Sequence, residues 1–464
     1  MKPRSKPQNS NSSPPTVALI SLGCPKNLVD SEKMLGQLAE AGCTILADVA
    51  EAEVIVVNTC GFLAAAREES LGVIREALAQ KAAGRARRIV VAGCLAQRDG
   101  AKLARKLPGV DAIVGINNRD DLARAVLGGG DENGEKSLIA VQSYAQRRRS
   151  GAPAIGQDTG RLRLTPRHTA YLRIGEGCSQ GCTFCTIPAI TGPFRSKPVQ
   201  QVLAEAAELV ADGAVELNII GQDTTSYGRD INYRGGLGGL LRQLDKTSGA
   251  RWIRLMYAYP TGVDGGLIDA LAECPHMVKY LDLPLQHIAD PILKGMRRRI
   301  TRRATEKLLE KLRRRIGNLH LRTTFIVGFP GEMEQDFAQL LEFVRAFRFD
   351  ALGVFEYSSE PGTPASRLAG RVGRSTARRR REQLMLVQQE VAFAANAAAV
   401  GKPLRVLVDG LDAHGRCIGR HAGQAPEVDS LCFLTARRAA GKFIDTEVVG
   451  WQDYDLVVRP RKKA

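Results

Sequence analysis

The sequence predicts an α/β protein with three domains: a Rossmann-like parallel sheet, a central partial barrel of six β/α units, and a small antiparallel β-barrel. At 464 residues the chain is long enough for two to three domains. Short runs of β-branched residues alternate with helical periodicity as far as residue 357, a pattern typical of parallel sheets. Residues 402–458 instead have short alternating strands and many glycines, which predicts a small barrel.

Changes in composition predict the domain boundaries. Residues 1–15 are polar and rich in Ser, Pro and Asn, so we expect a disordered tail there. We expect the N-terminal domain to cover residues 16–130 and a polar linker, rich in Gly, Arg and Gln, to cover residues 131–165. The central domain should then cover residues 166–398, and the OB-like barrel should cover residues 399–464.

Three apolar runs predict the N-terminal sheet. Residues 17–23, 54–59 and 89–93 are rich in β-branched side chains, as buried parallel strands are. Helical stretches at about residues 31–41 and 63–81 lie between them. The resulting β-α-β-α-β order predicts a parallel sheet with right-handed crossovers.

Each of these three runs ends at or just before a cysteine, and we call Cys24, Cys60 and Cys94 the strand-end cysteines. Ligands of open parallel sheets bind outside the carboxyl ends of the strands, so the fold should bring the three thiols together. For any one of them, a buried apolar cysteine is the alternative. Their shared position favours a ligand set for an iron–sulfur cluster, with one iron left open because such clusters take four thiolates.

Six further apolar segments predict the strands of the central sheet, with helical periodicity between them. The predicted strands are residues 171–174, 215–220, 252–257, 280–285, 321–327 and 352–357, and the predicted helices are residues 199–211, 267–273, 303–315 and 336–347. Six β/α units indicate a partial barrel of parallel strands. A basic helix at about residues 376–399 should connect this barrel to the C-terminal one.

A second group of three cysteines follows the first strand of the central sheet, and we call Cys178, Cys182 and Cys185 the loop cysteines. Three thiols within eight residues can wrap one cubane cluster and leave one iron open to bind a small molecule. A structural zinc knuckle is the alternative, because cysteine groups also bind zinc. His168 is the only nearby candidate for the fourth ligand that zinc would need.

Polar residues follow other strands of the central sheet, at the mouth where active sites of β/α barrels lie. Gln222 and Asp223 come after the second strand, and Gly328 and Glu332 come after the fifth. With Phe184, which precedes the last loop cysteine, they are the candidate contacts for a nucleoside and an amino-acid moiety. A turn or a loop cap is the alternative for each of these stretches.

The chain has a net charge of +17, which favours an anionic partner such as nucleic acid or a ribonucleoprotein. Part of the excess lies in a cluster of Lys294, Arg297, Arg298, Arg299, Arg302 and Arg303. Solvated faces are the alternative for such runs. Residues 402–458 carry seven Lys/Arg and eight Asp/Glu, a net charge of −1, so the C-terminal barrel is a poor candidate for binding phosphate.

No apolar stretch approaches the ~20 residues that span a membrane, and no signal peptide opens the chain. The two cysteine groups are typical of thiolate ligands in a reducing compartment. We therefore expect a cytoplasmic protein that binds no membrane. Cys43, Cys274, Cys417 and Cys432 lack such a context and should be packing residues.

The chain has the strand-end cysteines first, then the loop cysteines and then a terminal barrel. In this order of features it resembles the radical SAM methylthiotransferases, whose last domain is a TRAM domain. Residues 21–32, 222–228, 281–287 and 426–429 resemble the branch that modifies a ribosomal protein rather than the branch that modifies tRNA. The resemblance covers essentially everything after residue 15. Lys197, where the family usually has Arg, and Met333 are small departures from the family's pattern, and neither is a proposed ligand.

The resemblance implies two 4Fe–4S clusters and S-adenosylmethionine (SAM) as cofactors. The loop cysteines would hold the cluster that binds and cleaves SAM, and the strand-end cysteines would hold the cluster that carries the sulfur. A methylthio group would then be inserted at the β-carbon of an aspartate of small-subunit ribosomal protein twelve, within the 30S particle. An electron donor such as flavodoxin or ferredoxin would be a further partner, and no side chain is expected to act as a general acid or base.

Two other functions fit parts of the sequence. Methylthiolation of an adenosine in tRNA agrees with the basic clusters but not with the near-neutral terminal barrel or the branch motifs. A non-catalytic RNA or ribosome assembly factor would carry zinc in saturated ligand sets and would not cleave SAM.

Overall fold

The computed structural model describes residues 14–128, 138–149 and 155–461, so most of the predicted disordered tail lies outside the described residues. The chain forms two compact units. The first is Met1–Gly151 with Gly160–Leu162, and the second is Ala152–Thr159 with Arg163–Ala464. No helix of the described part is both long and apolar enough to cross a membrane.

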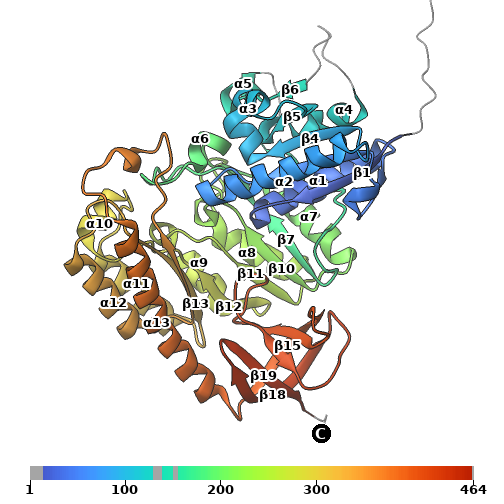
Figure 1. Ribbon diagram of the computed structural model, residues 1–464. Coiled ribbons are helices and arrows are strands. Elements are labelled where there is room, and N and C mark those ends of the chain that lie inside the picture. Colours follow the sequence, from blue (N-terminus) through green and yellow to red (C-terminus); the bar gives the residue numbers. More distant parts are fainter. Residues whose placement is uncertain (1–13, 129–137, 150–154, 462–464) are drawn as a thin grey trace, which may run out of the picture. The chain divides into compact units, whose positions relative to one another are not determined.

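The first unit is built on a parallel six-stranded sheet with the order β2-β1-β3-β4-β5-β6, of which Figure 1 labels β1, β4, β5 and β6. Its strands are β1 (Thr16–Ser21), β2 (Thr44–Ile45), β3 (Val54–Thr59), β4 (Arg88–Gly93), β5 (Ala112–Gly115) and β6 (Leu138–Ala140). Its helices are α1 (Pro25–Glu40), α2 (Ala64–Ala82), α3 (Cys94–Lys106), α4 (Leu122–Leu127) and α5 (Tyr144–Arg149). The predicted parallel sheet is confirmed.

Both faces of this sheet are covered, which explains why its strands are apolar without alternation. Val54 and Val56 of β3 point into one core, formed with residues of α1 and α4. Ile55 and Val57 point into the opposite core, formed with residues of α2 and α3. All four side chains are fully buried.

The structure of the first unit differs from the prediction at two boundaries, and its elements β2, β5, α3 and α4 were not predicted. The helix predicted from residue 31 begins at Pro25, because proline fits the first turn of a helix, where the missing N–H is not needed. The predicted linker, residues 131–165, contains β6, which pairs with β5, and the short helix α5. The first unit therefore extends beyond the boundary expected at residue 130.

The second unit contains a parallel sheet with the order β14-β13-β12-β11-β10-β7. Its strands are β7 (Thr169–Arg173), β10 (Glu216–Ile220), β11 (Trp252–Leu255), β12 (Met277–Asp282), β13 (His320–Val327) and β14 (Ala351–Glu356). The six strands and the partial barrel are confirmed. A small hairpin, β8 (Gly175–Glu176) with β9 (Arg195–Ser196), brackets the cysteine loop.

Helices cover the outer side of this sheet, and Figure 1 shows α11, α12 and α13 running together beside β13. The predicted helices are observed as α7 (Val199–Ala211), α9 (Gly265–Glu273), α11 (Arg302–Arg315), α12 (Glu334–Phe347) and α13 (Arg374–Ala399). Three helices were not predicted, the short α6 (Ile187–Thr191), α8 (Gly236–Thr247) and α10 (Asp290–Gly295). Three glycines in α8 obscured its periodicity, but its leucines pack into the central core.

The C-terminal segment forms a closed five-stranded barrel, as expected. Its strands are β15 (Pro403–Leu411), β16 (Cys417–His421), β17 (Cys432–Leu434), β18 (Phe443–Gln452) and β19 (Asp455–Pro460). The expected barrel was antiparallel, but β19 pairs with β17 in the parallel direction, so the barrel is not purely antiparallel. Cys43, Cys274, Cys417 and Cys432 are all buried, which agrees with their predicted packing role.

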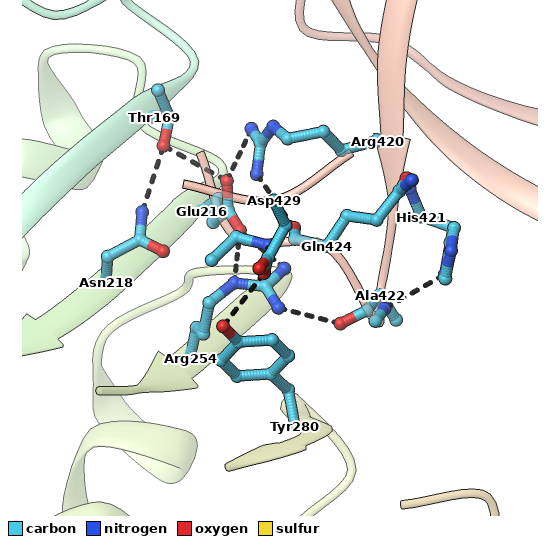
Figure 2. Close-up of polar contacts among 12 residues, drawn as sticks. Thr169, Glu216, Asn218, Arg254, Tyr280, Arg420, His421, Ala422, Gln424 and Asp429 are labelled. Atoms are coloured by element: carbon cyan, nitrogen blue, oxygen red, sulfur yellow. Dashed lines mark hydrogen bonds and ion pairs between the residues drawn. The ribbon is translucent and has the colours of Figure 1, made fainter. Parts of the chain in front are cut away.

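The terminal barrel closes the amino-terminal end of the central sheet through a buried ionic network (Figure 2). Glu216, the first residue of β10, pairs with Arg254 at 2.9 Å and with Arg420 of the terminal barrel at 2.8 Å. Arg420 also binds Asp409 at 2.8 Å, and Asp409 contacts His168 at 2.9 Å. Because Glu216, Arg254 and Arg420 are almost fully buried, each charge depends on its partners.

The loop that carries residues 426–429, one of the branch motifs, belongs to this same interface. Asp429 accepts a hydrogen bond from the Tyr280 hydroxyl at 2.9 Å and one from Arg322 Nε at 3.2 Å. Arg254 also donates to the Ala422 carbonyl at 2.8 Å (Figure 2). The motif therefore attaches the terminal barrel to the amino-terminal end of the central sheet, opposite to the end that carries the loop cysteines.

The charges of this network set its dependence on pH. Burial alone would raise the pKa of Glu216, but Arg420 and Arg254 together lower it to about 2. An unfolded glutamate has a pKa of about 4.3, so the stabilisation is complete above that pH. It is lost as the pH falls from there through the folded value, so the Glu216 carboxylate keeps its charge and both of its arginine partners in the neutral range.

We expect Arg420→Ala to destabilise the second unit by about 3–5 kcal/mol, because Glu216 and Asp409 lose a buried partner. Chemical denaturation, with limited proteolysis between α13 and β15, measures the effect. Arg416→Ala is the matched control, because Arg416 forms an exposed pair with Asp412 on the same barrel. Equal stability of the two variants would show that the network does not hold the barrel in place.

Candidate functional site

The strand-end cysteines converge at the carboxyl edge of the first sheet. Cys24 is the N-cap of α1, Cys94 is the first residue of α3, and Cys60 follows β3. Gly23 has φ +94°, and a Cβ added to it would lie 2.9 Å from the Cβ of Cys60. A Cβ added to Gly61 would lie 2.8 Å from the backbone of Cys94. The glycines thus let three chain segments approach closely enough to present three thiols together.

Polar contacts fix the loops that carry these cysteines. The Ser70 hydroxyl lies 3.1 Å from both the N–H and the carbonyl of Cys60. Asn58 Nδ2 donates to the Asn27 carbonyl at 2.9 Å and to the Ser31 hydroxyl at 2.8 Å. These side chains bind the backbone and one another, and none of their described hydrogen bonds involves a cysteine sulfur. The positions of the thiols are therefore fixed by the fold.

The electrostatics of this site suit a bound metal cluster. Burial raises the pKa of Cys94 well above its ordinary value, and the neighbouring Cys24 and Cys60 raise it further. Burial likewise raises the pKa of Cys60. Thiols with a raised pKa bind as thiolates when metal ions compensate their negative charge. The N-termini of α1 and α3 at the site add favourable dipoles for the negative charge of the thiolates.

The loop cysteines lie after the carboxyl end of β7, at the mouth of the central sheet. The N–H of Cys178 donates to the Gly192 carbonyl at 3.2 Å. Gly177 has φ +76°, and a Cβ there would lie 2.2 Å from the Pro193 carbonyl oxygen, so no other residue fits. The Thr183 hydroxyl donates to the Gly295 carbonyl at 2.8 Å. The loop is therefore held on both sides by neighbouring chain.

Burial raises the pKa of Cys178 to about 11 and that of Cys185 to about 12. In both cases the Cys182 thiol raises the pKa further, which shows that the three sulfurs lie close enough to repel one another as thiolates. As in the first unit, these two thiols need the charge of bound metal to become thiolates. Three protein ligands fit a cubane with one open iron.

The alternative of a zinc knuckle is not supported by the geometry. His168, the candidate fourth ligand, is directed to Asp409 of the terminal barrel at 2.9 Å. Within the described residues, no group of three or more His, Cys, Asp or Glu side chains could hold a single metal ion. His168 is therefore engaged elsewhere, and the loop cysteines are left as a set of three.

Two residues beside the loop cysteines were not predicted as part of the site. Arg298 is almost fully buried, and its Nη1 lies 3.7 Å from Cys182 Sγ. Its guanidinium stacks over Tyr259 at 4.1 Å, and the Tyr259 hydroxyl donates to the Arg298 carbonyl at 3.1 Å. In the sequence Arg298 was one cation in a basic cluster, and nothing there showed that it alone turns inward.

Gln222 and Asp223 follow β10 and lie beside the cysteine loop. Asp223 accepts hydrogen bonds from Gln180 of that loop at 2.6 Å and from the hydroxyls of Thr225 and Ser226 at 2.6 Å and 2.5 Å. The Oε1 atom of Gln222 is buried and receives no hydrogen bond from any described residue. Asp223 therefore orders the mouth, and Gln222 offers an unused acceptor there.

Phe184, Gly328 and Glu332 contribute mainly to the shape of the mouth. Phe184 is half-buried against an apolar cluster that includes Met296 and Phe329. Gly328 has φ +75°, and a Cβ there would lie 2.6 Å from the Cβ of Ala377. Glu332 Oε2 accepts hydrogen bonds from the N–H groups of Gly328 and Phe329. The other oxygen of this carboxylate, Oε1, is buried and has no hydrogen bond within the described residues.

Comparison with known proteins agrees with this geometry domain by domain. Uncharacterized protein family UPF0004 matches residues 16–115, the radical SAM superfamily matches residues 172–344, and the TRAM domain matches residues 400–460. A "Ribosomal protein uS12 methylthiotransferase RimO" of Anaeromyxobacter sp. (strain K) is 46% identical and covers 96% of this chain and 92% of its own length. The RimO protein of Geobacter sulfurreducens is 44% identical, with coverage of 95% and 97%.

The chain belongs to the RimO family of methylthiotransferases. It is a radical SAM enzyme, and its cofactors are two 4Fe–4S clusters and SAM. The predicted order of domains and the branch of the family are confirmed. The assignment of particular residues to each cofactor stays a prediction. The two sets of three thiols support it.

Solved structures share the fold of this RimO-family chain at low identity. TsrM from Kitasatospora setae, a radical SAM methyltransferase with a SAM analogue and tryptophan bound, has a TM-score of 0.57 and 16% identity. It covers 87% of this chain and 79% of its own. A second TsrM structure, with cobalamin and a 4Fe–4S cluster, has a TM-score of 0.54 and 18% identity, with coverage of 76% and 77%.

Proposed function

We propose that the chain inserts a methylthio group at the β-carbon of an aspartate of ribosomal protein uS12. Two SAM-dependent steps would be needed, a radical activation of the C–H bond and a methyl transfer to sulfur. The observation that carries the proposal is the presence of two separate sets of three converging thiols, each at the carboxyl end of a parallel sheet. One set is sufficient to cleave SAM, so the second set indicates a further task.

The loop cysteines are proposed to hold the cluster that binds SAM, and this group, when bound, supplies the electron that cleaves the SAM sulfonium. An unactivated C–H bond is beyond acid–base chemistry, so no side chain of the site needs to move a proton in that step. The residues of the mouth instead position SAM and limit access of water. Among them Gln222 offers its buried, unused oxygen as a direct contact.

For the other four proposed SAM contacts the structure supports a positioning role. Asp223 ties the loop after β10 to Gln180, and Phe184 packs the cysteine loop onto its neighbours. Gly328 permits a close approach of helix α13, and Glu332 holds the turn after β13 in place. SAM would be recognised by this assembled surface, in which the backbone contributes as well as side chains.

The strand-end cysteines are proposed to hold the second cluster, which carries the sulfur that becomes the methylthio group. Ser70, Asn58 and Asn27 keep the loops of this site in place without occupying the sulfurs. The half-buried positions of all three cysteines leave them reachable by small molecules. The proposed partners are uS12 within the 30S particle and a flavodoxin or ferredoxin as electron donor, all in the cytoplasm.

Mass spectrometry of uS12 tests the proposal. The purified, anaerobically reconstituted chain is incubated with SAM, a reductant and 30S particles that lack the modification. We expect uS12 to gain the mass of one SCH2 unit on a single aspartate-containing peptide. Analysis of tRNA nucleosides from the same type of reaction is the control. A methylthioadenosine without modified uS12 would contradict the proposal in favour of the tRNA substrate.

A further inference from the structure

The basic cluster at residues 294–303 is not used by the proposed chemistry, and most of it faces solvent. Lys294, Arg297 and Arg299 are exposed, whereas Arg298 between them is buried. Arg297 and Arg299 have φ values of +55° and +48°, in the left-handed region that side chains rarely adopt. This backbone turns residue 298 inward and its two neighbours outward.

The three exposed cations surround a groove of about 860 Å³ at the mouth of the central sheet. Its walls include Pro260 and Val263 after β11, and Ile300 and Leu308 before and within α11. One carboxylate, Asp290, also lines it and accepts a hydrogen bond from the N–H of Arg302 at 2.7 Å. The surface thus has apolar walls and a cationic rim.

This surface is formed in part by the sequence neighbours of Arg298, which contacts the proposed cluster ligand Cys182. Arg298 contacts Cys182 Sγ at 3.7 Å, while the adjacent Arg297 and Arg299 face the groove side of the same loop. The loop also contacts the cysteine loop through its backbone, since the N–H of Thr183 donates to the Met296 carbonyl at 3.2 Å. A molecule bound at the rim would therefore be separated from the cluster ligands by a single layer of chain.

We propose that this rim is the docking surface for the acidic redox protein that donates electrons to the cluster held by the loop cysteines. The inference rests on the proposed function and adds the place where the donor binds. One electron leaves the reduced cofactor of the donor, which is oxidised, and passes through the loop to the cluster. It is then consumed when the sulfonium C–S bond of SAM breaks, which yields methionine and the 5′-deoxyadenosyl radical.

Two features favour a protein partner over RNA at this surface. Apolar walls within a charged rim are typical of protein–protein interfaces. Among the described residues that line the groove there is no aromatic side chain on which a base could stack. Electron transfer through protein slows steeply with distance, which adds a functional reason to dock the donor where only one layer of chain intervenes.

The test compares a protein reductant with a chemical one. In the variant Arg297→Glu/Arg299→Glu, we expect the Kd for an acidic flavodoxin, measured by calorimetry at low salt, to rise by about 10-fold or more. SAM cleavage driven by a limiting concentration of reduced flavodoxin should fall by a similar factor. SAM cleavage driven by dithionite should be unchanged, because a small reductant needs no docking surface.

Arg437→Glu/Arg438→Glu is the matched control, because it makes the same charge change on exposed residues of the terminal barrel. Lys294→Glu is a second test variant, placed outside the left-handed positions in case the double variant folds poorly. Its effects should have the same direction and be smaller. Iron content and thermal unfolding are measured for all variants.

Unchanged flavodoxin affinity in both test variants would overturn the docking proposal. It would also be overturned if the variants kept their affinity for flavodoxin but lost uS12 modification with dithionite, since the surface would then bind the ribosomal substrate. Failure of the proposed function has a different signature: the unchanged chain, reduced by dithionite, would not modify uS12. The affinity for flavodoxin would remain measurable in that case.

Discussion

Cys182→Ala should abolish reductive cleavage of SAM and remove about half of the bound iron, from about eight to about four atoms per chain. The expected loss is large because the cubane has only three protein ligands, and an open iron can bind SAM only if the other three are held. Cys182 also lies next to Arg298, so its removal leaves that buried guanidinium without its sulfur contact. Iron analysis and chromatography of 5′-deoxyadenosine measure the two effects.

Cys274→Ala is the control for this variant. Cys274 is a buried thiol of the same unit that packs into the central core next to α9, and no other cysteine lies near it in the cores that the structure describes. Its replacement should cost some stability and leave both iron content and SAM cleavage intact. If Cys182→Ala cleaved SAM at the rate of the unchanged chain, the loop cysteines could not be the SAM-binding ligand set.

Local sequence patterns predicted much of the fold, because they show the periodicity of helices and strands and the residues at which these elements end. All six strands of the central sheet and the strands that end at Cys24, Cys60 and Cys94 were found from apolar runs. The helix α8 was not found, because Gly236, Gly238 and Gly239 lower helix propensity and tertiary packing of its leucines overrides it. The parallel pairing of β17 with β19 depends on barrel closure, which no local pattern reports.

The candidate site was predicted best where chemistry and spacing coincide. The convergence of each set of three cysteines could be predicted because packing alone does not require three thiols to share the same strand-end or loop position, and their role as cluster ligands stays a prediction. Arg298 was missed because the inward direction of one arginine among several depends on the φ values of its neighbours. Residues 426–429 were recognised as a branch motif, but only the structure shows that Asp429 binds Tyr280 and Arg322 and so attaches the terminal barrel.

Docking of the terminal barrel also changes how its charge is to be understood. The near-neutral balance of residues 402–458 made the barrel a poor candidate for binding phosphate. In the structure, Asp409, Arg420 and Asp429 already have partners within the chain. These three residues are therefore not available to an external partner, and the rest of the barrel surface must supply any further contact.

Cys60→Ala should separate the two halves of the reaction. We expect about half of the iron to be lost and reductive SAM cleavage to persist, while uS12 gains no methylthio group. Cys60 lies in the first unit, against the backbone of residue 23, and all of its described contacts are in that unit. Its loss should therefore leave the loop cysteines and their cluster intact.

The matched control is Cys43→Ala, a buried thiol of the same unit that packs into the core beside α1. This variant should keep its iron, its SAM cleavage and its product. Three measurements on each protein, iron, 5′-deoxyadenosine and the mass of uS12, distinguish a folding defect from a loss of the sulfur site. Complete modification of uS12 by Cys60→Ala would contradict the assignment of sulfur transfer to the strand-end cysteines. Loss of SAM cleavage in a folded Cys60→Ala protein would contradict the independence of the two sites.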